Sequence, residues 1–141
     1  MPAMASGTVD NSALPAVREA QGYLTKAIFN HPAFDEEGDR MYGKVFYVFE
    51  ETLEINEMLE MAHMGEDAEG TARAALQRAI ESNDRILDDA DGTLVELAKQ
   101  RYKDKDVSRI EDVDLGDELR SRAKDVRDAA VKALGKESSA P

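Results

Sequence analysis

Acidic residues recur at helical spacing in two segments of the chain. The first segment reads Glu50-Glu51-x-x-Glu54 and the second reads Glu81-x-x-Asp84. Residues three or four positions apart share one side of a helix, so each segment can present its carboxylates together. Carboxylates that converge from two helices bind hard divalent cations, and Mg²⁺ is held through carboxylates and substrate phosphates. These five residues are therefore candidate magnesium ligands.

An ExxE helix followed by an ExxD helix resembles the all-α nucleoside triphosphate pyrophosphohydrolases of the MazG type. The likeness covers the stretch from Glu50 to Asp84. It implies magnesium-dependent hydrolysis of nucleotides to monophosphate and pyrophosphate. It also implies that Glu50 or Glu51 acts as a ligand together with Glu54, Glu81 and Asp84. The alternative is that these carboxylates belong to solvated helix faces, since Glu50, Glu54 and Glu81 fall opposite the predicted apolar arcs.

A second metal hypothesis starts from Glu60-x-x-His63, the i, i+3 pair that ferritin-like di-iron bundles use. Such a site needs a second pair and two further inward glutamates. The other histidine, His31, precedes a proline in a predicted loop. The second pair would therefore have to come from a two-fold dimer, and the protein would be a carboxylate-bridged metal-binding bundle.

All but two of these candidates lie on one predicted central helix, Asp39 to Met64, which is the most apolar and aromatic segment. At about 100° per residue, its apolar side is broad, which indicates contact with more than one neighbouring element. The residues on this side are Met41, Val45, Phe46, Val48, Phe49, Thr52, Leu53, Ile55, Leu59 and Ala62. Glu50, Glu54 and Glu57 fall opposite, with Tyr47, Glu51 and Met58 at the margin.

Three polar residues of this helix, Asn56, Glu60 and His63, fall inside its apolar arc. A polar group that is buried without a partner costs roughly 1–3 kcal/mol. Three explanations remain open: an exposed helix end, a satisfied hydrogen-bond cluster, or a ligand or metal site. Asn83 interrupts the apolar stripe of the next helix in the same way, and the pattern does not predict that it meets Asn56.

The rest of the chain also reads as helix. One helix follows a Ser12 cap and ends near Asn30, and another starts at about Asp67 and ends in the acidic run before Gly92. A Thr93–Glu96 capping box starts a fourth helix, and Asp114 caps a fifth helix that ends at Gly135. The narrow stripe of the fifth helix predicts a place on the bundle surface or a homodimer contact. We therefore expect an all-α protein, a four- to five-helix bundle with a central antiparallel helix hairpin. Residues 1–10 and 136–141 are predicted tails, and 11–135 one domain.

The charge and the absence of cysteine limit the classes of partner and the cellular compartment to expect. Asp and Glu number 30 against 18 Lys and Arg, a net charge of −12, and the excess acid lies in residues 1–98. Phosphate-backbone binding needs clustered bases, so nucleic acid is not an expected partner, and an acidic face also disfavours anionic membranes. The chain has no cysteine and no recognisable secretory signal, which predicts a cytoplasmic protein.

The leading hypothesis is a non-enzymatic, acidic helical module of the accessory, chaperone or inhibitor type. It would need no cofactor and would bind another protein, a basic one by charge. Its predicted contact residues are Glu50, Glu54, Glu57, Met58, Met61 and Met64. Methionine side chains are flexible and adapt to partner surfaces, although they also fill cores.

Overall fold

A computed structural model describes residues 9–34, 42–62, 65, 67–89, 92–105 and 113–135. The described residues contain helices and no strands, which confirms the all-α prediction. The elements are a short 3₁₀ turn η2 (Asn11–Ala13), α1 (Leu14–Phe29), α2 (Lys44–Met61), α3 (Ala68–Leu87), α4 (Thr93–Arg101) and α5 (Asp117–Ala133).

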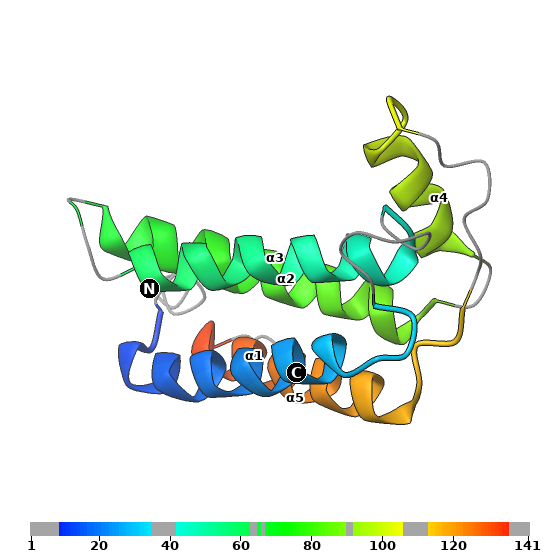
Figure 1. Cartoon of the computed structure of the whole chain (residues 1–141). Helices are drawn as coiled ribbons and strands as arrows, with labels where there is room; N and C mark the ends of the chain where they lie inside the picture. The colour runs from blue at the N-terminus through cyan, green and yellow to red at the C-terminus, as the bar shows by residue number, and fades with distance from the viewer. Residues whose placement is uncertain are drawn as a thin grey trace.

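Helices α1, α2, α3 and α5 form a four-helix bundle. Helix α2 packs against α1 and α3, and α5 packs against the same two helices from the other side. Figure 1 shows that α1 and α3 run in one direction and that α2 and α5 run in the opposite one. Helices α2 and α3 therefore form the predicted antiparallel hairpin, which makes one half of the bundle. The short helix α4 stands at the end where α2 begins and α3 ends, and it packs mainly on α2 (Figure 1).

The bundle core follows the apolar stripes of the four long helices. Small residues on α3 and α5 let these two helices approach closely: Ala75, Ala79, Ala123 and Ala130 are all fully buried. Helix α5 was expected on the surface because its stripe is narrow. It is instead a full member of the bundle, because its alanines need little space between α1 and α3. The stripe on which the homodimer prediction rested is thus buried within one chain.

The backbone conformation of Tyr42 and Gly43 sets the start of α2. Tyr42 adopts a positive φ of 70°, and Gly43 has an extended backbone, so the helix begins at Lys44. A positive φ is unusual for a bulky residue. The Tyr42 ring packs against Phe46 and Tyr102 at centroid distances of 5.6 and 5.0 Å, which helps to hold this conformation. The predicted start at Asp39 lies outside the described residues.

The capping residues were predicted with mixed success. Helix α3 starts at Ala68, next to the predicted start at about Asp67, and Asp67 caps it by accepting a hydrogen bond from the Gly70 N–H at 3.2 Å. Thr93 does not cap α4. Instead, the carboxylate of Asp89 accepts a hydrogen bond from the Leu94 N–H at 3.3 Å.

The other two predicted caps also differ in the structure. Asp10, not Ser12, accepts the hydrogen bond of the first turn, at 3.1 Å from the Ser12 nitrogen. Asp114 accepts from the Gly116 N–H ahead of α5 rather than from the helix itself. Val9 is buried, and the Asp10 N–H donates to the Ala133 carbonyl. These two residues were expected in the N-terminal tail, but they pack on the bundle. Residues 1–8 and 136–141 lie outside the described residues.

Across the described ranges, no helix is both long and apolar enough to span a membrane.

Candidate functional site

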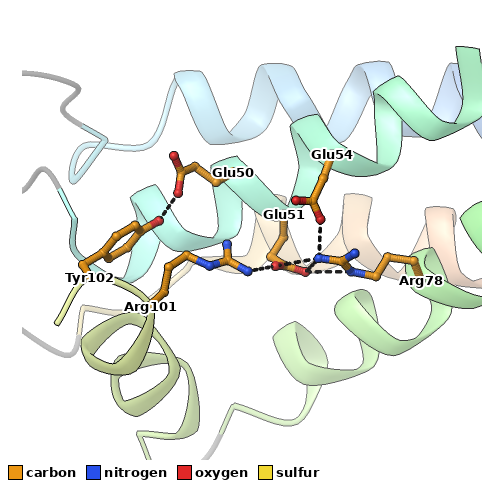
Figure 2. A network of polar contacts seen from close by, with 6 residues as sticks. All are labelled: Glu50, Glu51, Glu54, Arg78, Arg101 and Tyr102. Atoms are coloured by element: carbon orange, nitrogen blue, oxygen red, sulfur yellow. Dashed lines mark hydrogen bonds and ion pairs between the residues drawn. The ribbon is translucent and has the colours of Figure 1, made fainter. Parts of the chain in front are cut away.

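Glu51 is the most deeply buried carboxylate of the α2 acidic segment. Its residue is 2 % exposed, although the sequence pattern placed it only at the margin of the apolar arc. Figure 2 shows that it lies where α2, α3 and α4 meet, between an arginine of α3 and one of α4. Arg78 binds both carboxylate oxygens, with its Nη2 at 3.0 Å and its Nε at 3.2 Å, and Arg101 binds one of them. Glu51 therefore joins three helices.

The two arginines decide the charge state of Glu51. Burial alone would raise the pKa of this carboxyl, but the hydrogen bonds and positive charges of Arg78 and Arg101 outweigh it and lower the pKa. The Arg78 pKa is raised in turn, first by its hydrogen bond to Glu51. Glu51 is thus a carboxylate at neutral pH and is held by two charge-assisted contacts.

The neighbouring glutamates extend this network (Figure 2). Glu54 forms an ion pair with Arg78 at 2.5 Å. Glu50 accepts a hydrogen bond from the Tyr102 hydroxyl, whose pKa is raised by burial and by this contact. The Arg101 guanidinium also lies over the Tyr47 ring, 4.4 Å from its centroid, a cation–π geometry. The network attaches α4 to α2 and α3.

The predicted magnesium ligands do not share one site. Glu51 and Glu54 are both engaged by Arg78, whereas Glu81 is exposed on α3. Asp84 pairs with Arg127 of α5 at 3.1 Å. Within the part of the chain that the structure describes, no group of three or more His, Asp or Glu side chains could hold a metal ion. The arginines occupy the carboxylates that a cation would need.

The polar residues of the α2 apolar arc have separate environments. Asn56 accepts from the Gln21 side-chain amide at 2.6 Å and donates to the Thr25 hydroxyl at 3.2 Å, so it belongs to a hydrogen-bond cluster between α1 and α2. Glu60 is exposed. Asn83 is buried and donates to the Ala79 carbonyl at 2.8 Å. His63, the partner of Glu60 in the second metal hypothesis, lies outside the described residues.

One side of α2 is left uncovered by other described helices. We call it the outward face of α2; its residues are Glu50, Leu53, Glu54, Glu57, Glu60 and Met61. Leu53 is 39 % exposed and Met61 is 56 % exposed, both large values for apolar side chains. Glu57 and Glu60 form no ion pair with any described residue. The single base of α2, Lys44, is buried and pairs with Asp89.

The predicted contact residues differ in their exposure. Glu57 and Met61 are exposed, and Glu50 is half-buried by Tyr102. Met58 is half-buried and packs against the core, whereas Met64 lies outside the described residues. Leu53 was expected in the apolar arc, but it faces outward because α1 and α4 leave that side of α2 uncovered.

An aromatic cluster continues the outward face towards α1. Phe29 packs edge-on against Phe49, with ring centroids 5.2 Å apart, and Phe34 packs against both rings. Phe49 lies one turn before Leu53 on α2. Phe29 remains 49 % exposed, so an apolar surface extends from Leu53 to the end of α1. Phe29 was not predicted as part of a site. The available signal was a large aromatic residue outside the buried stripe of α1, which consists of Leu14, Val17, Gln21, Leu24, Ala27 and Ile28.

The fold and this surface define a class of protein, a four-helix bundle with an acidic and partly apolar exposed helix face. Comparison of the chain with protein-family models, with curated proteins and with solved structures gives no match. Function is therefore inferred from the residues of this chain alone.

Proposed function

We propose that the protein is a non-enzymatic interaction module that binds another protein through the outward face of α2. The observation that carries the proposal is the combination of the exposed Leu53 and Met61 with Glu57 and Glu60, which form no ion pair with a described residue. Exposed apolar side chains rimmed by polar ones are typical of protein-binding surfaces. The apolar groups supply contact area, and the glutamates supply orientation.

Charge adds a preference for basic partners. The chain carries a net charge of −12, and all the exposed charged residues of α2 are glutamates. A surface of one charge sign accelerates encounter with the opposite sign and disfavours like-charged partners. The preferred partner is a protein with a basic contact surface.

Catalysis has less support from the same residues. The pyrophosphohydrolase hypothesis needs Glu51 and Glu54 to be available for Mg²⁺, and Arg78 binds both of them. Freeing Glu51 would also leave Arg101 without a carboxylate and Arg78 with Glu54 alone. The network is better explained as the attachment of α4.

The proposal is tested by selecting binders from a displayed library of random peptides, with the full chain as bait. Selected peptides should lose most of their binding to a Leu53→Ser/Met61→Ser double variant. Tyr23→Ser is the matched control: Tyr23 is 46 % exposed, but it lies on α1 beneath Arg122 of α5. Peptides that bind the double variant as well as they bind the wild type would overturn the proposal, and so would a library that yields no binder.

A further inference from the structure

We infer that the outward face of α2 receives one basic amphipathic helix from a partner protein. This inference rests on the proposed function and deepens it, because it names the shape and chemistry of the occupant. Its basis is the spacing of the exposed residues, their charges, and the apolar surface that Phe29 adds at one end.

The exposed residues form one straight strip along α2. The other five residues lie 3, 4, 7, 10 and 11 positions after Glu50, which is the spacing of a single helix face. At a rise of about 1.5 Å per residue the strip is about 16 Å long. A partner helix of about three turns covers this length.

The apolar residues of the strip fix where the partner must be apolar. Leu53 and Met61 are eight residues apart, or about 12 Å along the helix. A partner helix meets both of them when it carries apolar side chains at i, i+4 and i+8. Recognition by a stripe of apolar anchors at such steps is the usual way in which a helix binds a protein surface.

The glutamates fix where the partner must carry positive charge. Along α2, Glu57 lies between Leu53 and Met61, and Glu60 lies next to Met61; neither glutamate has an ion-pair partner among the described residues. Glu54 is already compensated by Arg78, so the charge is strongest towards the Met61 end. Lys or Arg residues beside the anchors of the partner would meet these carboxylates.

Helix α1 widens the apolar surface at the Leu53 end. Thr25 bonds to Asn56, which places the line of Gly22, Thr25 and Phe29 beside α2. The exposed Phe29 ring, packed on Phe49 one turn before Leu53, adds apolar contact area at this end for a large anchor such as leucine or an aromatic residue.

The same charges disfavour other occupants. A second copy related by a two-fold axis would place this face against itself, with glutamates opposite glutamates. Nucleic acids and anionic membranes are repelled for the same reason. A basic helix is the occupant that complements both the charge and the apolar pair.

The test uses three synthetic helical peptides of equal length and the full chain. The first has Leu at i, i+4 and i+8 with Lys and Arg elsewhere. The second permutes the same residues so that no apolar stripe forms, and the third replaces the bases by Glu. Binding is measured by fluorescence anisotropy at low and at physiological salt. The contact is smaller than a standard interface, so we expect the first peptide to bind with a dissociation constant on the order of micromolar.

Variants of the chain then locate the binding. Leu53→Ser should weaken the first peptide about tenfold, as expected for an anchor residue. The Glu57→Gln/Glu60→Gln double variant should weaken it about fivefold at low salt and less at high salt. Glu19→Gln is the matched control, an exposed glutamate of α1 with no ion pair to a described residue, and it should change binding less than twofold.

The outcomes separate this inference from the proposed function. Equal binding of the permuted peptide would show that charge alone drives association and would overturn the inference. Library binders that need the outward face but are neither basic nor helical would also overturn it, while the proposed function would stand. A concentration-dependent dimer that Leu53→Ser dissociates would make a second copy the occupant and would overturn it as well.

Discussion

Glu51 shows how one side chain can decide the arrangement of three helices. It is a buried carboxylate whose two arginine partners are each about one-third exposed, with side-chain values of 32 % for Arg78 and 31 % for Arg101. Removing one partner of a buried ion pair leaves the other charge uncompensated, which costs several kcal/mol when both are fully buried. Solvent screening of the arginines reduces this cost here.

The charge of Glu51 makes part of the stability depend on pH. Its pKa in the folded protein is lowered from the ordinary value of 4.5, so its contribution is present above that value and is lost as the pH falls through the folded pKa. We expect Glu51→Gln to reduce the free energy of unfolding by about 2 kcal/mol at pH 7. This difference from the wild type should shrink between pH 5 and pH 3.

Urea unfolding of both proteins at pH 7, 5 and 3 measures this difference. Glu118→Gln is the control, because Glu118 is an exposed glutamate that pairs with Arg122 at 3.0 Å. It should change the unfolding free energy by less than about 0.5 kcal/mol. A Glu51→Gln effect that stays constant with pH would contradict the assignment.

At the scale of elements, α4 is attached by polar contacts more than by a core of its own. Its nine residues bury Leu94, Val95 and Ala98, while Arg101 and the following Tyr102 bond to glutamates of α2. Asp89, at the start of the turn into α4, pairs with the buried Lys44 and caps the helix. An element with few apolar contacts opens locally before the whole fold does.

Removing the Arg101 contact should therefore loosen α4 selectively. We expect Arg101→Ala to increase the hydrogen exchange of α4 amides about tenfold, a change of roughly 1.4 kcal/mol in local stability. The amides of α1 and α5 should keep their wild-type rates. Lys99→Ala is the control, since Lys99 is exposed and only pairs within α4 with Glu96, at 3.7 Å. Uniformly faster exchange throughout the bundle would refute a local attachment.

Gly22 offers a test of helix α1. A glycine inside a helix costs roughly 0.5–1 kcal/mol relative to alanine, and nothing obstructs a Cβ atom at this position. We expect Gly22→Ala to raise the melting temperature by about 2–4 °C. At Gly70 of α3 the new Cβ would lie 2.3 Å from the capping carboxylate of Asp67, so Gly70→Ala should give little or no gain. Calorimetry of both variants checks this contrast, and a lower melting temperature for Gly22→Ala would contradict it.

The sequence predicted the elements better than the contacts between them. Helical periodicity located all five helices, because a buried stripe of 3.6-residue spacing is a property of the segment itself. It misjudged Glu51 and Leu53, which both lie at the edges of the α2 arc. Their burial depends on which neighbour covers each edge: α3 and α4 cover Glu51, and no described helix covers Leu53. Caps such as Asp89 were missed because turn geometry selects among several nearby polar groups.

At the scale of the whole molecule, the charge is distributed unevenly. The bundle buries its apolar stripes, including that of α5, and leaves an acidic helix face with Leu53 and Met61 exposed. A helix face that only contacts solvent can consist of charged residues alone. Apolar side chains exposed among those charges reduce solubility unless they contact a partner. The outward face of α2 is therefore the surface on which the proposed interaction function rests.

The most direct test of that function maps a library-selected peptide onto the chain by backbone amide chemical shifts. The proposal predicts perturbed amides between Glu50 and Met61 and at Phe29, with α5 unchanged. It also predicts that the Leu53→Ser/Met61→Ser variant shows no perturbation at the same peptide concentration. A bound peptide that perturbs α3 or α5 and leaves Leu53, Glu57 and Met61 unshifted would contradict the account.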